Sequence, residues 1–425
     1  MLISIGSSIG FLIPAAAPTP PLTLAPPSEN NVGRSNAQLW KAVVGIDAPR
    51  QMRRALEFLE GRPEFIEKDK IQRLLHEGEA RMRSRGLSYR LLCRENPEIL
   101  CWEDEELGAR LDRLSILLPN HPTPRLLHCH PRAFAYAHLS KRKFLTRLFS
   151  DRMSLCIQNM AASFNCDAAA TLSGEDGVLI TEQERQTVGN EDAMIMRGRR
   201  LLNKMKRAEQ SAEDLAELEA LWGYTRLKFS KRAFRTFEAL SFGGNRLRFG
   251  NLYDDFSSPS FPLRIASVGG GPGSDVAGAI IWHEITYGNQ GNMKARIFDV
   301  SDAWRGISQM TADAVETDIE FGKCDVSESL FSSSVNEEFS LFVRSEARVG
   351  HPWLFIFSFV LFEAGHGSQR FVYDLWDAMP KFSAFLLLDV PAAGPLSDFA
   401  SYVSCTARGH VSYMKKLSRG YIIMK

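Results

Sequence analysis

The apolar residues in the C-terminal part of the chain form short continuous runs, which alternate with polar stretches and with stretches of helical spacing. Apolar runs without strict alternation are typical of strands in a parallel sheet that is covered on both faces. Strands that alternate with helices predict a doubly wound α/β domain over residues 256–425, with its site at the carboxyl ends of the strands. The strands are expected at residues 263–268, 295–300, 319–326, 353–360 and 384–390, with two more near 410–414 and 420–424.

The N-terminal part has a different pattern, in which apolar positions follow helical spacing, and it predicts an all-α region over residues 31–165. An apolar pair followed by a proline recurs there every 34 residues: Phe58-Leu59 before Pro63, Leu92-Cys93 before Pro97, and Leu126-Leu127 before Pro131. Proline lacks an amide donor, so it lies in the first turn of a helix or ends one. Each unit is therefore expected to be a helix pair that stacks on the next unit.

This spacing resembles the helical repeat of the mitochondrial transcription termination factor family, over residues 48–149. The resemblance implies a superhelix that binds nucleic acid in an organelle, with RNA as a partner of the helical region. Helical repeats of similar length also bind proteins, so a protein partner is the open alternative.

Two segments flank the helical region. Residues 1–30 have no charged side chain before Glu29 and are expected to be a disordered tail, with a plastid leader as the weaker interpretation. Residues 166–255 are predicted to be a linker, with a loop over 166–190, and connecting helices that include residues 193–227. The basic run from Arg197 to Arg207 in these helices is expected to be a solvated face, balanced by Glu213, Asp214, Glu217 and Glu219.

Composition narrows the class of protein. The chain has 425 residues, 44% of them hydrophobic and 24% charged. Its net charge is +1, which excludes binding of nucleic acid through an overall positive charge. Residues 31–150 alone contain 22 Lys and Arg against 15 Asp and Glu, a local excess of +7. The seven cysteines form no C-x-x-C pair, which favours a reducing compartment. With no apolar run long enough for a bilayer, the protein is expected inside the cell, in the cytoplasm or an organelle, away from membranes.

The strongest motif follows the first predicted strand. The apolar run ends in Gly269, Gly271 and Gly273, and a helix is expected from Ser274. Glycine lets the backbone turn sharply and approach a ligand without a Cβ in the way. Ser274 or Asp275 is expected to cap that helix, and Gly278 to let it pack closely on the strand.

The next two strands each end in an acid. Asp299 comes 26 residues after Gly273, at a strand end where a carboxylate can accept both hydrogen bonds of a ribose diol. Asp325 ends the third strand, where an acid can reach an adenine amino group. The glycine loop is not a P-loop, because no Gly-Lys-Ser/Thr follows. A nicotinamide dinucleotide site is a distant third alternative, because its fingerprint needs a glycine where Ser274 stands.

This series of strand ends resembles the Rossmann-like class I S-adenosylmethionine-dependent methyltransferases, over residues 264–425. The resemblance implies S-adenosyl-L-methionine as the cofactor, with the three loop glycines against its methionine part, Asp299 on the ribose and Asp325 on the adenine. Ser358, at the end of the fourth strand, joins the cofactor-binding set. Ser267 stands where the family often has an acid, and Asp275 is expected to compensate.

Catalysis needs few side chains, because a sulfonium is already an activated methyl donor. Glu363 and His366, just beyond the fourth strand, are the candidate general bases if the acceptor must lose a proton. No metal is expected, because the adjacent residues His128, Cys129 and His130 rarely point at one ion. Cys324 and Cys405 are predicted to be inert rather than nucleophilic. Four aromatic residues are predicted to pack on the domain rather than to form a lid: Trp222, Phe229, Phe234 and Phe237.

Two functions of different class follow. The first is a methyltransferase of unknown acceptor, with RNA favoured slightly by the basic helical region. The alternative is a non-enzymatic helical-repeat module that binds nucleic acid or protein, with a degenerate methyltransferase-like domain as a scaffold.

Overall fold

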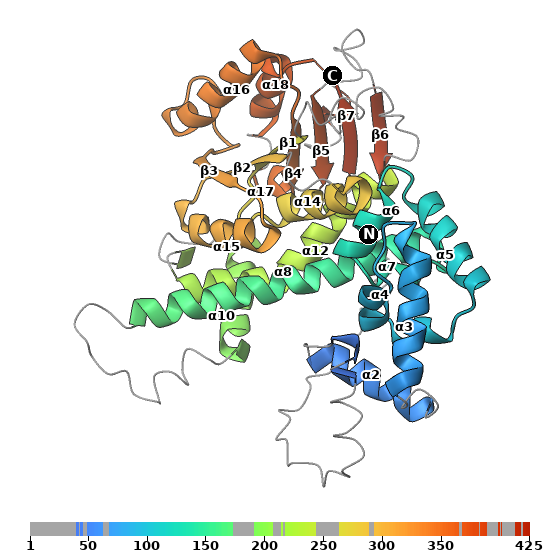
Figure 1. The fold of residues 1–425 in the computed structure, drawn as a ribbon. Coiled ribbons are helices and arrows are strands. Elements are labelled where there is room, and N and C mark those ends of the chain that lie inside the picture. The colour runs from blue at the N-terminus through green and yellow to red at the C-terminus, as the bar shows by residue number, and fades with distance from the viewer. Residues whose placement is uncertain are drawn as a thin grey trace, which may run out of the picture. The chain divides into compact units, whose positions relative to one another are not determined.

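The structure is a computed structural model, and it describes residues 40–41, 43–45, 49–62, 68–172, 191–206, 214–215, 217–243, 263–288, 293–364, 368–381, 383–388, 398–399, 401, 413–417 and 420–425. Contacts within the chain define two compact units, Met1–Glu103 and Asp104–Lys425. The elements of the N-terminal unit include helices α2 (Pro49–Gly61), α3 (Lys68–Arg83) and α4 (Tyr89–Glu95) and the 3-10 helix η2 (Pro97–Cys101) (Figure 1). The all-α prediction therefore holds for the described part of this unit.

The 34-residue spacing has a counterpart in local structure. Helix α4 ends at Asn96 (φ −140°, ψ 78°), whose N–H donates to the Leu92 carbonyl. Helix α6 (Thr123–Cys129) ends in nearly the same way at His130 (φ −132°, ψ 64°), whose N–H donates to the Leu126 carbonyl. A proline follows each of these residues, then a short turn of helix, η2 or α7 (Ala133–Tyr136), and then a longer helix, α5 (Asp104–Leu117) or α8 (Lys141–Leu172). Pro63 lies outside the described residues.

The C-terminal unit contains a seven-stranded sheet of order β3-β2-β1-β4-β5-β7-β6. Strands β1 to β5 pair in parallel, and β7 is antiparallel to both β5 and β6. This confirms the Rossmann-like doubly wound fold, and the order reverses between β1 and β4, where such sheets bind their ligands. The bounds are β1 Leu263–Val268, β2 Met293–Asp299, β3 Ile319–Lys323, β4 Leu354–Ser358, β5 Ala384–Leu388, β6 Tyr413–Leu417 and β7 Gly420–Met424.

All seven strands were expected from the sequence, but several bounds were wrong. The third strand ends at Lys323 rather than residue 326, because the Asp325 amide leaves the ladder and donates to Asn336 Oδ1 at 2.7 Å. The fourth ends at Ser358 rather than residue 360, because Phe359 adopts a left-handed conformation with φ 68°. The described part of the sixth strand is Tyr413–Leu417, and residues 410–412 of the predicted strand lie outside the described residues.

Helices cover both faces of the sheet (Figure 1). Helices α14 (Ser274–Tyr287) and α15 (Arg305–Val315) lie on one face with α8, α10 (Glu191–Lys206) and α12 (Leu218–Gly243), while α16 (Glu337–Val349) and α18 (Ser368–Ala378) cover the other. Helix α14 is apolar nearly all round and buried over most of its length, as expected for a helix enclosed between a sheet and a second helix. The shorter elements are η4 (Asp302–Trp304), η5 (Ser334–Asn336) and α17 (Val360–Ala364).

The start of α14 differs from the sequence prediction. Its N-cap residue is Gly273, in a left-handed conformation, and neither Ser274 nor Asp275 caps it. Gly278 provides a close approach to helix α12 rather than to a strand, because a Cβ there would lie 2.2 Å from the Ala233 carbonyl oxygen. Helix α12, which packs on α14 at this point, precedes the predicted α/β domain. The sequence prediction considered only strands as partners of Gly278 and therefore missed this contact.

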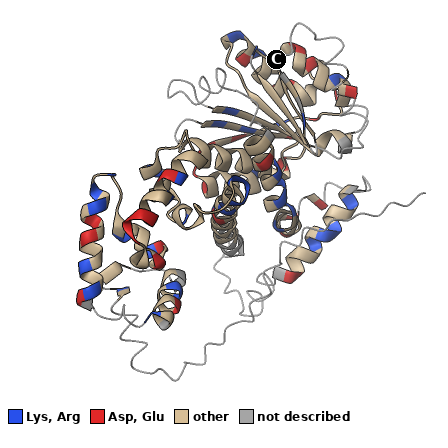
Figure 2. Ribbon diagram, turned by 90° about the vertical axis from the view of Figure 1, so that its right-hand side faces the viewer, with Lys and Arg blue, Asp and Glu red and all other residues tan. Residues whose placement is uncertain are grey.

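Two expectations for the connecting region have different outcomes. The loop predicted from Cys166 is wrong up to Leu172, because α8 continues through this alanine-rich segment, and alanine is a strong helix former. Residues 173–190 lie outside the described residues. The basic face of α10 is balanced by acids as predicted, since Arg197 pairs with Glu219 and Lys204 with Asp214. Figure 2 shows basic and acidic residues interspersed along the helices.

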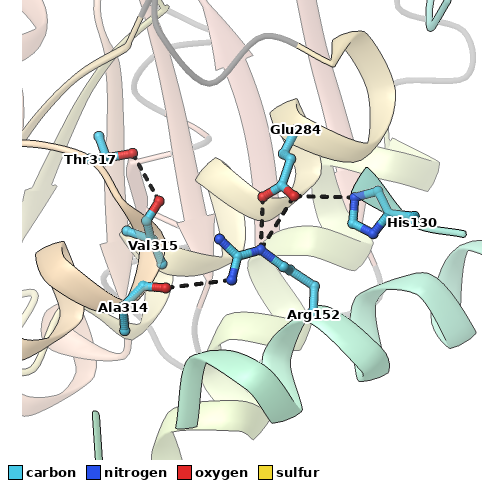
Figure 3. Close-up of polar contacts among 6 residues, drawn as sticks. All are labelled: His130, Arg152, Glu284, Ala314, Val315 and Thr317. Atoms are coloured by element: carbon cyan, nitrogen blue, oxygen red, sulfur yellow. Dashed lines mark hydrogen bonds and ion pairs between the residues drawn. The ribbon is translucent and has the colours of Figure 1, made fainter. Parts of the chain in front are cut away.

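A buried ion cluster joins α8 to α14 (Figure 3). Arg152 Nε lies 3.0 Å from Glu284 Oε2, and His130 Nε2 lies 3.2 Å from Glu284 Oε1. The other arm of Arg152 reaches the Ala314 carbonyl oxygen of α15 at 3.5 Å. Burial alone would raise the pKa of Glu284, but the contact with His130 and the charge of Arg152 outweigh it and hold this pKa at about 2.

Helices α10 and α12 cross with their backbones in contact, and this crossing gives a stability prediction. A Cβ on Gly223 would lie 1.9 Å from the Met194 carbonyl oxygen, and one on Gly198 would lie 2.1 Å from the Gly223 carbonyl carbon. Gly223→Ala is therefore expected to lower the free energy of unfolding by about 2 kcal/mol or more, because the helices must separate. Urea unfolding followed by circular dichroism measures this change.

Gly108→Ala is the matched control, because Gly108 is also helical and a Cβ there would meet no atom within 4 Å. It is expected to be neutral or to stabilise the protein by up to about 1 kcal/mol. Equal effects of the two substitutions would contradict the close crossing.

Candidate functional site

The glycine loop joins β1 to α14 at the switch point of the sheet. The Gly269 N–H donates to the Phe298 carbonyl oxygen of β2 at 2.7 Å. Gly269 and Gly273 have φ of 68° and 80°. A Cβ on Gly269 would lie 2.3 Å from Val360 Cγ2, and one on Gly273 would lie 2.7 Å from Ile297 Cδ1. Packing inside the protein therefore requires glycine at both positions, apart from any ligand.

Gly271 is different, because its neighbours leave more room. Its φ is 50°, and the nearest atoms to a Cβ there would be those of the Trp304 ring, at 3.6 Å and beyond. Its N–H donates to Asp299 Oδ2 at 2.8 Å. The loop after β1 and the acid that ends β2 are thus brought together, as the sequence predicts.

Asp299 is held by backbone donors. Besides Gly271, the Ser301 N–H donates to Asp299 Oδ1 at 3.1 Å. The residue keeps 8% of its surface exposed. Burial raises the pKa of Asp299 to about 6, although the hydrogen bonds from Ser301 and Gly271 work in the opposite direction. The carboxylate is therefore oriented, poorly hydrated and close to its titration range at neutral pH.

Asp275 occupies a different position from the one expected of a ligand-facing group. It is 1% exposed, and its Oδ2 accepts a hydrogen bond of 2.6 Å from Ser267 Oγ. Its Oδ1 accepts from the Val276 N–H at 3.0 Å. Burial raises the pKa of Asp275 despite these hydrogen bonds. Ser267, which stands where the family often has an acid, is thus hydrogen-bonded to Asp275. This bond links the strand before the glycine loop to the helix after it.

Asp325 lies at the neighbouring strand end. The Cys324 N–H donates to the Asp299 backbone carbonyl at 3.0 Å, which places the ends of β2 and β3 side by side. Asp325 Oδ1 accepts from both the N–H and the hydroxyl of Ser327, at 2.9 and 2.6 Å. The residue is half-buried.

Ser358 completes the set at the end of β4. It is 4% exposed, and within the described part of the chain its buried Oγ has no hydrogen-bond partner. Buried hydroxyls are nearly always paired, so this hydroxyl next to the glycine loop could pair with a ligand group. Since Phe357 pairs with Val268, Ser358 at the end of β4 lies level with Gly269, the first residue after β1.

Two residues at this edge were missed by the sequence analysis. Val300, directly after Asp299, is 52% exposed, which is unusual for a valine at the end of a buried strand. Phe359, directly after Ser358, is half-buried and has a left-handed backbone. The available signal was a large apolar residue directly after each strand end. Such a residue is easily missed, because in the sequence it looks like a continuation of the apolar strand.

The proposed bases are not located by the structure. Glu363 lies in helix α17, with its side chain outside the described residues, and His366 lies wholly outside them. Cys324 is 2% exposed, and burial raises the pKa of its thiol well above the usual value, which agrees with an inert cysteine. Trp222 stacks on Phe164 with ring centroids 4.9 Å apart, and Phe229 and Phe237 are fully buried, as predicted for packing residues.

The residues at this edge fit an adenosyl cofactor. A fixed carboxylate, a half-buried second carboxylate, an exposed apolar side chain and an orphaned hydroxyl lie at the ends of β2, β3 and β4, on either side of the glycine loop that follows β1. Among the described residues, no three His, Cys, Asp or Glu side chains come together as metal ligands. In the same part of the chain, no helix combines the length and apolar character needed to cross a bilayer.

No family model matches the chain, and no curated protein matches its sequence. Its fold is similar to that of solved methyltransferases at low identity. The CurJ carbon methyltransferase is 11% identical, with 75% of this chain and 96% of that chain covered and a TM-score of 0.34. A protein described as a class I S-adenosylmethionine-dependent methyltransferase from Listeria monocytogenes is 13% identical, with 76% and 87% covered and a TM-score of 0.31. An O-methyltransferase family protein from Burkholderia thailandensis is 11% identical, with 55% and 69% covered and a TM-score of 0.33. At such values the assignment of the fold rests on the strand order, and the resemblance of the helical region to termination factors stays a prediction.

Proposed function

We propose that this protein is an S-adenosylmethionine-dependent methyltransferase whose cofactor binds at the carboxyl edge of β1, β2 and β3. The observation that carries the proposal is the 2.8 Å hydrogen bond from the Gly271 N–H to Asp299, which joins the glycine loop to a strand-end carboxylate at the switch point. Dinucleotide-binding sheets have the order 3-2-1-4-5-6 with parallel strands. Here an antiparallel β7 lies between β5 and β6, which disfavours the nicotinamide alternative.

The bound cofactor would supply a methyl group on a sulfonium, which needs no further activation. The chain's own residues bind and orient it. Asp299 would hold the ribose hydroxyls, Asp325 would hold the adenine amino group, and Val300 would cover the base. The loop of Gly269, Gly271 and Gly273 admits the methionine part close to the backbone. Glu363 or His366 serves as general base if the acceptor must lose a proton.

RNA is the acceptor class that we favour. Four arginines are exposed around the turn between α3 and α4, namely Arg81, Arg83, Arg85 and Arg90. The nearby acid Glu79 accepts hydrogen bonds from the Tyr89 and Arg90 amides, so its charge is partly used within the unit. A group of exposed guanidinium groups suits the phosphates of a nucleic acid.

Calorimetric titration of the full chain with S-adenosylhomocysteine and, separately, with NAD tests the proposal. Binding of S-adenosylhomocysteine alone is expected, and preferential binding of NAD would contradict it. A transfer assay with tritiated methyl donor and total cellular RNA then separates the two functional classes. Labelled RNA supports the enzyme, whereas cofactor binding without turnover on cell extracts supports the non-enzymatic scaffold.

The pKa of Asp299 gives a pH prediction. The ribose diol donates its hydrogen bonds, so Asp299 must be ionised to accept both of them. Because burial raises the Asp299 pKa to about 6, affinity for S-adenosylhomocysteine is expected to fall as the pH drops through 6, by roughly tenfold at pH 5. Titrations between pH 5 and 8 measure this dependence. Asp299→Asn is expected to bind weakly with a flat profile, and a flat profile in the unsubstituted protein would contradict the assignment.

A further inference from the structure

Phe359 is the most unusual residue at the candidate site. Its φ of 68° lies in the left-handed region, which a bulky side chain rarely adopts. The conformation is fixed by the Phe359 N–H, which donates to the Leu388 carbonyl oxygen at the end of β5 at 2.7 Å. The next residue, Val360, packs against Gly269, so Phe359 is placed directly beside the glycine loop.

Two arginines of helix α12 stack on the Phe359 ring. The guanidinium carbon of Arg232 lies 5.2 Å from the ring centroid, and that of Arg235 lies 4.8 Å from it. All three side chains are half-buried. Cation–π contacts of this geometry hold planar guanidinium groups in fixed orientations.

The same arginines are connected to the glycine loop from the other side. Arg232 also lies 5.6 Å from the Tyr224 ring centroid, and Tyr224 packs on Trp304 with centroids 5.4 Å apart. Trp304 in turn borders Gly271. Burial raises the pKa of both Asp275 and Asp299, and the charge of Arg232 acts against that rise at each carboxyl. Arg232 is thus electrostatically part of the site.

We propose that the methyl acceptor is an anion whose phosphate or carboxylate group is held by Arg232 and Arg235 on the Phe359 platform. This inference rests on the proposed function, because it assigns the acceptor side of the same site. The methyl donor carries a positively charged sulfonium, so two added cations beside it disfavour a cationic acceptor and favour an anionic one. Guanidinium groups bind phosphate and carboxylate with paired, directional hydrogen bonds. The two positions are therefore specificity-determining residues.

The test uses the full chain saturated with S-adenosylhomocysteine and two probes, a fluorescein-labelled single-stranded RNA decamer and 4-hydroxybenzoate. Anisotropy measures binding of the first, and calorimetry measures binding of the second. At least one probe is expected to bind. The double substitution Arg232→Gln with Arg235→Gln is expected to weaken its binding by about 30-fold or more, since it removes the charged hydrogen-bond donors of both guanidinium groups. Affinity for S-adenosylhomocysteine, measured at pH 8, is expected to change much less than probe binding, because the Asp299 pKa of about 6 leaves that carboxyl ionised at this pH.

Arg142→Gln is the matched control, because Arg142 also stacks on a phenylalanine, Phe242, with 5.6 Å between guanidinium carbon and centroid, and its side chain is 72% exposed. It is expected to leave both affinities unchanged. The Lys-for-Arg double variant keeps the charges and is expected to retain more probe binding than the Gln variant. If the Gln variant loses RNA binding, the group held by the two arginines is a phosphate. If it loses hydroxybenzoate binding, that group is a carboxylate. If neither probe binds, or if the Gln variant binds as tightly as the unsubstituted chain, the inference is overturned. If the unsubstituted chain does not bind S-adenosylhomocysteine at all, the proposed function is overturned instead.

Discussion

Replacing Glu284 by alanine is expected to lower the free energy of unfolding by about 3–5 kcal/mol, the largest stability effect predicted for this chain. Glu284 and Arg152 are both nearly buried, with 5% and 6% of their side chains exposed. Removal of the carboxylate leaves the Arg152 guanidinium without a charge partner in a poorly hydrated interior, and it removes the contact with His130. Urea unfolding measures the loss.

Two further variants separate the ion pair from simple packing. A double variant, Arg152→Met with Glu284→Leu, is expected to recover much of the loss, because an apolar pair of similar size removes the desolvation penalty of both charges. Asp374→Ala breaks the exposed pair with Arg370, whose side chain is 79% exposed, and is expected to cost under about 1 kcal/mol. A Glu284→Ala effect no larger than that of Asp374→Ala would show that the buried cluster does not hold α8 to α14.

The same cluster predicts loss of stability in acid. The pKa of Glu284 is lowered to about 2 from an ordinary value of 4.5, so its contribution is fully present above pH 4.5. As the pH falls from 4.5 to 2 the unfolded state binds a proton at this residue while the folded state stays ionised, so stability falls by roughly 3 kcal/mol. Unfolding curves between pH 2 and 6 are expected to show this decline, and the decline should be much smaller in the Met-Leu double variant.

Asp299→Ala is expected to weaken binding of S-adenosylhomocysteine by more than 100-fold. The substitution removes the acceptor of two ribose hydrogen bonds, each worth about 1.5–3 kcal/mol when the partner is charged. It also releases the Gly271 N–H, which Asp299 Oδ2 holds at 2.8 Å. Calorimetry measures the affinity, and far-ultraviolet circular dichroism checks that the sheet remains folded.

Asp302→Ala is the control for Asp299→Ala. Asp302 lies three residues further on, is 58% exposed and pairs with Arg305 on the surface. It is expected to bind S-adenosylhomocysteine as the unsubstituted chain does. Similar losses in the two variants would mean that general negative charge near β2, rather than the Asp299 carboxylate, determines the affinity.

The sheet was predictable because its signals are local. Strand β1 is fully buried and followed by glycines, and β2 ends in the acid that the pattern singles out, so periodicity and turn chemistry were sufficient. The contact between Gly271 and Asp299 followed from topology, since adjacent parallel strands end at the same edge.

The parts that the sequence did not predict depend on contacts between distant segments. Arg152 and Glu284 are 132 residues apart, and nothing in the local sequence of either marks a buried ion pair. Gly278 was assigned to a strand contact, whereas its neighbour is Ala233 of α12. Phe359 was counted as part of a strand, because a left-handed φ at a phenylalanine leaves no trace in an apolar run.

A crystal structure of the full chain with S-adenosylhomocysteine tests the central claim most directly. The account predicts that both ribose hydroxyls lie within hydrogen-bond distance of the Asp299 carboxylate, with the adenine between Val300 and Asp325 and the methionine part along the Gly269–Gly273 loop. Density for the ligand at another edge of the sheet, or a glycine loop left empty at saturating ligand, would contradict it.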